Sequence, residues 1–299
     1  MLDPKLQTFL QVSETGSFTR AAEQLSLTQP AVSQHVRQLE QELGVKLLRR
    51  GGGGLKLTPE GEIAVRYAKR MIALSQSLKQ EILDHQRQLT HITVGLTHTG
   101  ESNSVAEALA RYCSENRSVK IIVVTDTIKN LYDKLRAYEI DLAVVEGPVS
   151  EPGFSSLLLD TDSLVLVVPN SHPLVRKGLV TMEELKRQRM LLRLPESGTQ
   201  NLFVAHLESR GLSLEEFNVV LEVDNIATIK DLVRRGYGVS ILARSACLDE
   251  LKKGKLTALP VENLSMVREI HLVYQPDFSH SDILREISRM YHEAARFYR

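Results

Sequence analysis

Polar side chains near the start of the chain have the types and spacing that hydrogen bonding to the edges of nucleic-acid bases requires. One face of the segment after residue 28 is polar and carries Gln29, Ser33, Gln34, Arg37 and Gln41. Its other face is apolar at helical spacing, with Val32, Val36, Leu39 and Leu43. In the major groove, Gln can bond adenine through two hydrogen bonds and Arg can bond guanine in the same way. A solvated polar face on any helical hairpin would give the same pattern, so the face alone leaves both interpretations open.

The elements that position this face are predicted as three short helices. Asp3 and Pro4 favour a helix start that leads to a stop at Gly16, and Ser17 caps a second helix. A three-residue connection over 26–28 leads to the third helix, which Thr28 caps and which has Pro30 in its first turn. Two short helices on a tight turn, the second with a polar face, are typical of a helix-turn-helix.

Basic residues flank a run of four glycines at 51–54, directly after the third helix. Arg49 and Arg50 precede the glycines and Lys56 follows them, in two arms that favour β-strands. This pattern predicts a hairpin, the wing, with its basic side chains near phosphates or a minor groove. A flexible glycine loop is the alternative.

Three stretches of the sequence resemble a known protein family. They are Ser17–Leu25 (SFTRAAEQL), Thr28–Glu40 (TQPAVSQHVRQLE) and Leu57–Gly61 (LTPEG), and they resemble the LysR-type bacterial transcriptional regulators over about sixty residues. The resemblance implies an N-terminal all-α winged helix-turn-helix, a long linker helix and a C-terminal two-lobed α/β effector domain like a periplasmic binding protein. The DNA-binding residues that we expect are Ser17, Arg20, Thr28, Gln29, Pro30, Ser33, Gln34, Arg37, Arg49, Arg50 and Lys56. The glycine tip lacks the side chains that many relatives carry there, so we expect weak readout by the wing.

A long helix follows, with a cap signal at 58–60 and a helical pattern to about residue 88. A heptad seam of spacings four and three runs along it: Ala64, Ala68, Met71, Ser75, Leu78, Ile82, His85 and Leu89. We expect dimerisation through Ala64, Ala68, Met71, Leu78 and Ile82. Ile63, Tyr67 and Leu74 form an adjoining stripe, expected to pack against the helix-turn-helix of the same chain. An ordinary amphipathic helix on its own domain is the alternative.

From residue 91 the pattern changes to strands that alternate with helices, which predicts a mainly parallel sheet covered by helices. We therefore expect a DNA-binding domain at 1–58, a linker and dimerisation helix at 59–89 and an effector-binding domain at 90–299. The resemblance divides the last into lobe I (90–161 and 267–299) and lobe II (162–266), with weaker family marks here than at the N-terminus.

Ligands of open α/β sheets bind beyond the carboxyl ends of strands, where helix starts supply free N–H groups. The expected effector-binding residues lie at such ends: Thr97, His98, Thr99, Gly100, Ser102, Thr125, Glu146, Ser197, Gly198 and Thr199. Hydroxyls and N–H groups at helix starts favour a small anion or carboxylate, whereas Glu101 and Glu146 argue against a highly charged one. Plain helix capping is the alternative for each Thr and Ser. The stretch 97–99 is similar to the corresponding loop of sulfate- and acetylserine-sensing members.

Composition agrees with this prediction and excludes several other classes. Lys plus Arg and Asp plus Glu both number 37, but residues 1–90 hold 12 basic against 9 acidic residues, which favours a polyanion partner at that end. No apolar run approaches the ~18 residues of a membrane span, so we expect a cytoplasmic protein with no membrane partner. Two cysteines, Cys113 and Cys247, are too few for a disulfide scaffold, and buried structural cysteines are favoured over a peroxide-sensing pair. No cofactor, metal or catalytic motif is found.

The function that we expect is sequence-specific transcriptional regulation modulated by a small effector bound between two lobes. The expected partners are double-stranded DNA, the effector, a second copy of the chain (a homodimer, and a dimer of dimers) and RNA polymerase. Two rivals remain: a constitutive DNA-binding protein whose lobes bind nothing, and an enzyme in which residues 91–299 act on a metabolite.

Overall fold

The computed structural model describes residues 3–51, 54–101, 104–149 and 151–296. The chain divides into two compact units, Met1–His91 with Arg136–Glu139, and Ile92–Leu135 with Ile140–Arg299. Each unit is described by itself below.

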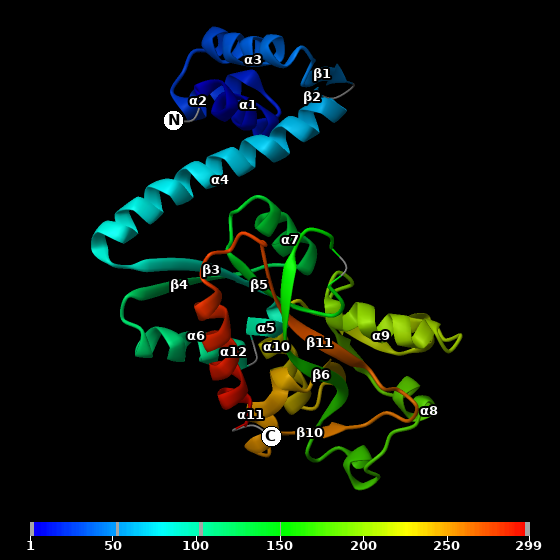
Figure 1. Ribbon diagram of the computed structural model, residues 1–299. Helices are drawn as coiled ribbons and strands as arrows, with labels where there is room; N and C mark the ends of the chain where they lie inside the picture. The colour runs from blue at the N-terminus through cyan, green and yellow to red at the C-terminus, as the bar shows by residue number, and fades with distance from the viewer. Residues whose placement is uncertain (1–2, 52–53, 102–103, 150, 297–299) are drawn as a thin grey trace. The chain divides into compact units, whose positions relative to one another are not determined.

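The first unit begins with three capped helices (Figure 1): α1 Pro4–Thr15, α2 Phe18–Leu25 and α3 Gln29–Leu43. Asp3, Ser17 and Thr28 each accept a hydrogen bond from a backbone N–H of the first turn, as predicted. Gly16 and Gly44 end α1 and α3 in the left-handed conformation, at φ 62° and 69°. The boundaries predicted from cap residues are therefore confirmed.

One apolar core joins these helices. Its fully or nearly fully buried residues are Phe9, Val12, Ala21, Ala22, Val32, Val36, Leu39 and Leu47. Leu43 was expected in this stripe, but its side chain is 51% exposed. It occupies the last position of α3, immediately before the helix ends at Gly44.

The predicted wing is confirmed as an antiparallel hairpin of β1 Leu48–Gly51 and β2 Gly54–Leu57; the tip, 52–53, lies outside the described residues. Two side chains fasten its base. The buried Glu40 carboxylate of α3 accepts hydrogen bonds from the N–H groups of Leu47 (2.9 Å) and Leu48 (3.4 Å). The hydroxyl of Thr58 donates to the carbonyl of Lys46 at 2.7 Å.

The long helix α4 spans Pro59–Arg87, with Thr58 as its N-cap and Gln88 as its C-cap. Both ends lie where the sequence predicts them. Near its C-terminus, the buried Asp84 carboxylate lies 2.7 Å from the Nδ1 atom of His91 and accepts a hydrogen bond from Gln80. These contacts tie the last turns of the helix to the segment that follows it.

The second unit alternates strands and helices, and strands β3 and β5 each lie close to their predicted positions. The described strands are β3 Thr90–Leu96, β4 Val119–Thr125, β5 Leu142–Glu146, β6 Ser155–Pro169, β7 Met190–Leu192, β8 Val219–Glu222, β9 Ser240–Ala243, β10 Leu256–Leu259 and β11 Val267–Tyr274. The α-helices are α5 His98–Glu101, α6 Ser104–Glu115, α7 Ile128–Arg136, α8 Met182–Lys186, α9 Gly198–Glu208, α10 Ile226–Arg234, α11 Leu248–Lys252 and α12 Ser281–Arg296. Short 3₁₀ turns lie at Pro173–Arg176, Leu214–Glu216 and Ser245–Cys247.

The sheet is mixed, so the expectation of a mainly parallel sheet is wrong. Strands β3 and β5 are parallel, as are β7 and β8, but β6 pairs antiparallel with β9, β10 and β11, and β11 pairs antiparallel with β5. The physical reason is that the long strand β6 pairs antiparallel with β11 along its first part and with β9 and β10 along its second part (Figure 1). The first half of β6 and all of β10 were missed from sequence.

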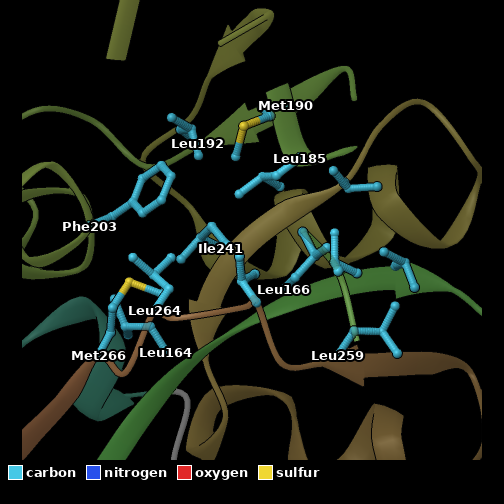
Figure 2. Close-up of a cluster of buried hydrophobic side chains, with 14 of the residues drawn as sticks. Leu164, Leu166, Leu185, Met190, Leu192, Phe203, Ile241, Leu259, Leu264 and Met266 are labelled. Carbon is cyan, nitrogen blue, oxygen red and sulfur yellow. The ribbon is translucent and has the colours of Figure 1, made fainter. Parts of the chain in front are cut away.

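The largest apolar cluster in each half of this unit draws on a different set of residues. One is drawn from residues between 92 and 159 and between 270 and 291, with α6 and α12 packed against each other. The other is drawn from residues between 164 and 266. Figure 2 shows the second core, where Leu166 and Ile241 of the sheet face Met190 of β7 and Phe203 of α9. Each half therefore has its own hydrophobic interior.

Within the described ranges, no helix combines the length and the apolar character needed to cross a membrane.

Candidate nucleic-acid interface and effector site

The polar face of α3 is open to solvent in the first unit. Gln29, Gln34 and Arg37 have exposed side chains, while Ser33 is partly buried. The side-chain amide of Gln29 donates to the hydroxyl of Ser33 at 2.8 Å, one helical turn away. Because Gln29 and Ser33 engage each other, Gln34 and Arg37 are the side chains on this face best placed to offer free hydrogen-bonding groups to an incoming base.

The other predicted residues of the helix-turn-helix lie at helix starts. The hydroxyl of Ser17 accepts from the N–H of Arg20, and the hydroxyl of Thr28 accepts from the N–H of Ala31, both at 3.4 Å. The guanidinium of Arg20 donates to the carbonyl of Thr15. Pro30 is exposed in the first turn of α3. Capping therefore accounts for the hydroxyls of Ser17 and Thr28.

The wing places two basic side chains side by side. Arg49 and Lys56 are directly opposite each other in the β1–β2 register, and both are exposed. Opposite residues of an antiparallel pair project to the same face. Arg50 lies in β1 opposite Leu55, and its side chain is outside the described part of the structure.

The helix α4 has an exposed apolar stripe, but its residues differ from the predicted seam. Met71, Leu78 and Ile82 of the seam are 51%, 59% and 53% exposed. Ala68 is fully buried within the chain, and Ala64 packs on the core of α1–α3.

A correction concerns the neighbouring stripe on α4. Ile63, Tyr67 and Leu74 were expected to pack against the helix-turn-helix of the same chain, yet they are 49%, 54% and 48% exposed. Ala64 and Val65 contact that core instead. The exposed stripe therefore consists of Ile63, Tyr67, Met71, Leu74, Leu78 and Ile82, which still recur at intervals of four and three.

In the second unit, the loop after β3 lies beside the end of β5. The buried hydroxyl of Thr97 accepts from the N–H of Gly100 (2.9 Å) and donates to the Glu146 carboxylate, whose oxygens lie at 2.7 and 2.8 Å. Thr99 is also buried. Thr97 is thus both a helix cap and a partner of Glu146. Ser102 falls outside the described residues.

Residues from the other half of this unit approach the same place. A Cβ atom added to Gly198 would lie 3.4 Å from Ile128 and 3.9 Å from the Nη1 atom of Arg268. Ser197 caps α9 by accepting from the N–H of Gln200 at 3.2 Å, and Thr199 is buried in the first turn of that helix. Nε2 of His98 lies 3.9 Å from the carboxylate of Asp224.

Thr125 closes β4 and is partly buried. Among the described residues, no hydrogen bond joins Thr125 to Thr97, Glu146 or Gly198. The observed contacts therefore define two groups among the ten predicted effector residues. One is Thr97 with Gly100 and Glu146, and the other is Ser197 with Gly198 and Thr199 at the start of α9.

Two buried arginines of this region were missed from sequence. Arg193 directly follows β7, is 2% exposed and donates to Asp224 at 3.1 Å. Arg268 is 6% exposed, and its Nη2 atom lies 3.5 Å from Asp162, its partner in the β6–β11 register. An arginine within an apolar strand pattern is a usable signal, since a buried charge must be paired or bind a ligand.

The charge of Glu146 is set by its surroundings. Burial raises the pKa of its carboxyl above the ordinary value, and nearby Asp162 acts in the same direction. The charge of Arg268 and the hydrogen bond from Thr97 oppose this increase without cancelling it. A carboxyl with a raised pKa beside two arginines is a site where protonation and anion binding can be coupled.

The described residues contain no cluster of three or more His, Cys, Asp or Glu side chains that could hold a metal ion. Cys113 and Cys247 are free thiols, and burial raises the pKa of Cys247 to about 12. Such a buried thiol is unreactive at neutral pH.

Comparison with known proteins identifies both parts of the chain. Residues 4–62 match the bacterial regulatory helix-turn-helix proteins of the lysR family, and residues 85–296 match the LysR substrate binding domain. An uncharacterized HTH-type transcriptional regulator of Methanocaldococcus jannaschii is 30% identical over 277 residues, which cover 91% of this chain and 93% of that protein. The HTH-type transcriptional regulator CysL of Bacillus subtilis is 26% identical, covering 91% of this chain and 90% of that protein. These relatives are transcriptional regulators rather than enzymes.

Solved structures share the fold. CbnR, a LysR family transcriptional regulator, aligns with a TM-score of 0.69 at 18% identity, covering 99% of both chains. Full-length CbnR complexed with its target DNA aligns with the same TM-score at 19% identity, covering 98% of this chain and 100% of that one. The helix-turn-helix, the two-lobed α/β unit and these matches lead to one conclusion: the chain belongs to the LysR family of transcriptional regulators, which combine a DNA-binding helix-turn-helix with an effector-binding domain.

Proposed function

We propose that this regulator reads its operator with Gln34 and Arg37 of α3, while Arg49, Arg50 and Lys56 of the wing hold phosphates. The observation that carries this proposal is the exposed face of α3 next to a basic wing. Both belong to the DNA-reading head, which comprises helices α1–α3 and the wing, and three N-caps fix where its helices begin. Base contacts discriminate between sequences, whereas phosphate contacts position the protein on the duplex. The residues at the helix starts and beside this face complete the proposed DNA-binding surface: Ser17, Arg20, Thr28, Gln29, Pro30 and Ser33.

The chain pairs through α4 in this proposal. The exposed stripe from Ile63 to Ile82 supports it, because six large apolar side chains facing solvent on one helix favour burial against a second copy. Two-fold pairing would supply two reading heads for two half-sites. We also propose that two such dimers associate into a dimer of dimers, that the protein contacts RNA polymerase, and that it is located in the cytoplasm.

We assign residues 1–58 to the DNA-binding domain, 59–89 to the linker helix and 90–299 to the effector domain. Lobe I would comprise 90–161 and 267–299, and lobe II 162–266. The effector is a small anion or carboxylate that contacts Thr97–Gly100 from one lobe and Ser197–Thr199 from the other. The proximity of Gly198 to Arg268 and Ile128 supports a ligand that touches both lobes.

The test of the effector site is a pair of variants, Thr99→Val and Thr199→Val. A thermal-shift screen of small carboxylates and amino-acid precursors first identifies a compound that stabilises the wild type. Losing a hydroxyl that bonds a charged ligand costs about 1.5–3 kcal/mol, roughly ten- to a hundred-fold in affinity. We expect both variants to bind operator DNA normally and to lose the response to that compound.

Thr181→Val is the matched control, because Thr181 is an N-cap hydroxyl of another helix, α8, where it accepts from the N–H of Glu184. It should lose about 1 kcal/mol of stability and keep the response. Wild-type response in both Thr99→Val and Thr199→Val would contradict the proposed site.

A further inference from the structure

The second unit has a buried polar cluster formed by Thr97, Glu146, Asp162, Arg193 and Arg268. Several hydrogen-bond donors of this cluster have no acceptor in the described chain. Nε and Nη1 of Arg193 and Nε of Arg268 are buried and have no hydrogen-bond partner. Both side chains are at least nine-tenths buried. Buried polar groups are almost always hydrogen-bonded, so several guanidinium N–H groups without a partner at one place point to a site that binds an ion or another polar ligand. Their charge and geometry suit an anion, since guanidinium groups bond carboxylate and sulfate oxygens in pairs.

Glu146 lies in the same cluster and lacks a direct ion pair. In the described structure, no Lys, Arg or His nitrogen lies within 4.0 Å of its carboxylate, and its hydrogen bonds come from Thr97. The charged groups that act on it are Arg268 of β11, Asp162 of β6 and Arg193 of the segment after β7. Asp162 is the partner of Arg268, and Asp224 is the partner of Arg193. His98 lies beside Asp224.

An anion bound to the two arginines would place another negative charge next to Glu146. Like charges at short range in a buried site repel strongly, and the repulsion is relieved when one of them takes up a proton. Asp162 and Asp224 already pair with the arginines, which leaves Glu146 as the carboxylate whose protonation costs no ion pair. The proton comes from solvent and is held on a carboxylate oxygen of Glu146.

We infer that an anion bound by Arg193 and Arg268 enters together with a proton taken up by Glu146, so that effector affinity falls as the pH rises. This inference rests on the proposed effector site and adds to it the groups that bind the charge and a pH-dependent regulation. The coupling is reciprocal: the anion favours protonated Glu146, and protonated Glu146 favours the anion.

The experiment uses the full chain with two probes, sodium acetate and sodium sulfate, at constant ionic strength. Isothermal titration calorimetry in two buffers of different ionisation enthalpy measures protons taken up per anion bound. We expect uptake by the wild type, more for sulfate than for acetate because of its second charge. The titrations are repeated at several pH values, and the wild-type affinity should fall as the pH rises, by up to about tenfold per pH unit where Glu146 loses its proton.

Glu146→Gln mimics the protonated form and keeps the shape of the side chain. It should bind both anions with no proton uptake and with an affinity that does not change with pH. Glu262→Gln, which changes an exposed carboxylate of the same unit, should behave as the wild type. Proton uptake by Glu146→Gln equal to that of the wild type would overturn the inference.

The arginines are tested by Arg193→Gln and Arg193→Lys, with the exposed Arg235→Gln as the charge-matched control. We expect Arg193→Gln to lose tenfold or more in anion affinity, Arg193→Lys to lose less, and Arg235→Gln to lose nothing. Absence of anion binding by the wild type, or unchanged binding by both Arg193 variants, would also overturn the inference. Either failure is distinguishable from failure of the proposed effector site, which depends on the response of the Thr99 and Thr199 variants to a metabolite.

Discussion

The DNA-reading head and the buried polar cluster use charge in opposite ways. In the head, Gln34, Arg37, Arg49 and Lys56 are exposed and lie within one short stretch of chain. In the cluster, the arginines are almost completely buried, and Arg268 finds its partner 106 residues away. The difference reflects the size of the partner: a duplex is reached from a surface, whereas a small ligand is bound tightly only when it is enclosed.

The two regions also differ in energetic cost. Exposed polar side chains on a helix cost little, so the head can carry them without compensating contacts. Buried charges are expensive, and a buried pair often stabilises a protein less than an apolar replacement would. The guanidinium N–H groups of the cluster that have no hydrogen-bond partner among the described residues therefore favour a binding role over a purely structural one.

A substitution in the exposed stripe of α4 should have the largest effect on DNA binding, because two half-sites can be read only if two copies of the chain pair. Leu78→Glu would place a carboxylate in the proposed interface, where an unpaired charge costs several kcal/mol. We expect the dimer dissociation constant to rise by about a hundredfold or more, measured by sedimentation. Gln76→Glu adds the same charge on another face of the helix and should leave the dimer intact. A well-folded Leu78→Glu dimer with full operator affinity would place the interface elsewhere.

Glu40 can be compared directly with Glu146, because it is a buried carboxylate in the DNA-reading head. Burial by itself raises its pKa, but hydrogen bonds from Lys46 and from the N–H groups of Leu47 and Leu48 outweigh this effect and lower the pKa below 4.5. A lowered pKa in the folded state stabilises the protein above the unfolded value, and this stabilisation is lost as the pH falls through the folded value. Glu40 is thus the opposite of Glu146, whose pKa is raised.

Glu40→Gln should therefore lower the free energy of unfolding by about 1–3 kcal/mol at neutral pH and by less in acid. Urea denaturation at both pH values measures this difference, with the exposed Glu42→Gln as the control on the same helix. Operator affinity should fall as well, because the wing loses its anchor. An equal loss of stability at neutral and acid pH would contradict the assigned role.

The sequence predicted the head far better than the cluster, for a physical reason. Helix caps, a glycine stop and hairpin arms act over a few residues, so Ser17, Thr28 and Gly44 set boundaries that the structure confirms. The stripe on α4 was predicted with the correct period but the wrong face for Ile63 and Tyr67, because only tertiary packing shows which side α1–α3 cover.

The cluster could not be assembled from local patterns. Loop positions after strands led to Thr97 and Glu146, which do lie together. Arg193 and Arg268 were missed because their neighbours are far away in sequence and because the register of β6 with β11 depends on a long antiparallel pairing. The same pairing explains why a mainly parallel sheet was expected and a mixed one is found.

The central claim is that α3 reads sequence while the wing holds phosphate, and Gln34→Ala against Lys56→Ala tests it most directly. The duplex is one selected by the wild-type protein from a random pool, and a scrambled duplex serves as the control, both titrated by fluorescence anisotropy at several salt concentrations. We expect Gln34→Ala to lose about 1–3 kcal/mol on the selected duplex and little on the scrambled one. Lys56→Ala should weaken both duplexes alike and reduce the salt dependence. Equal losses on both duplexes for Gln34→Ala would contradict the assignment of sequence reading to α3.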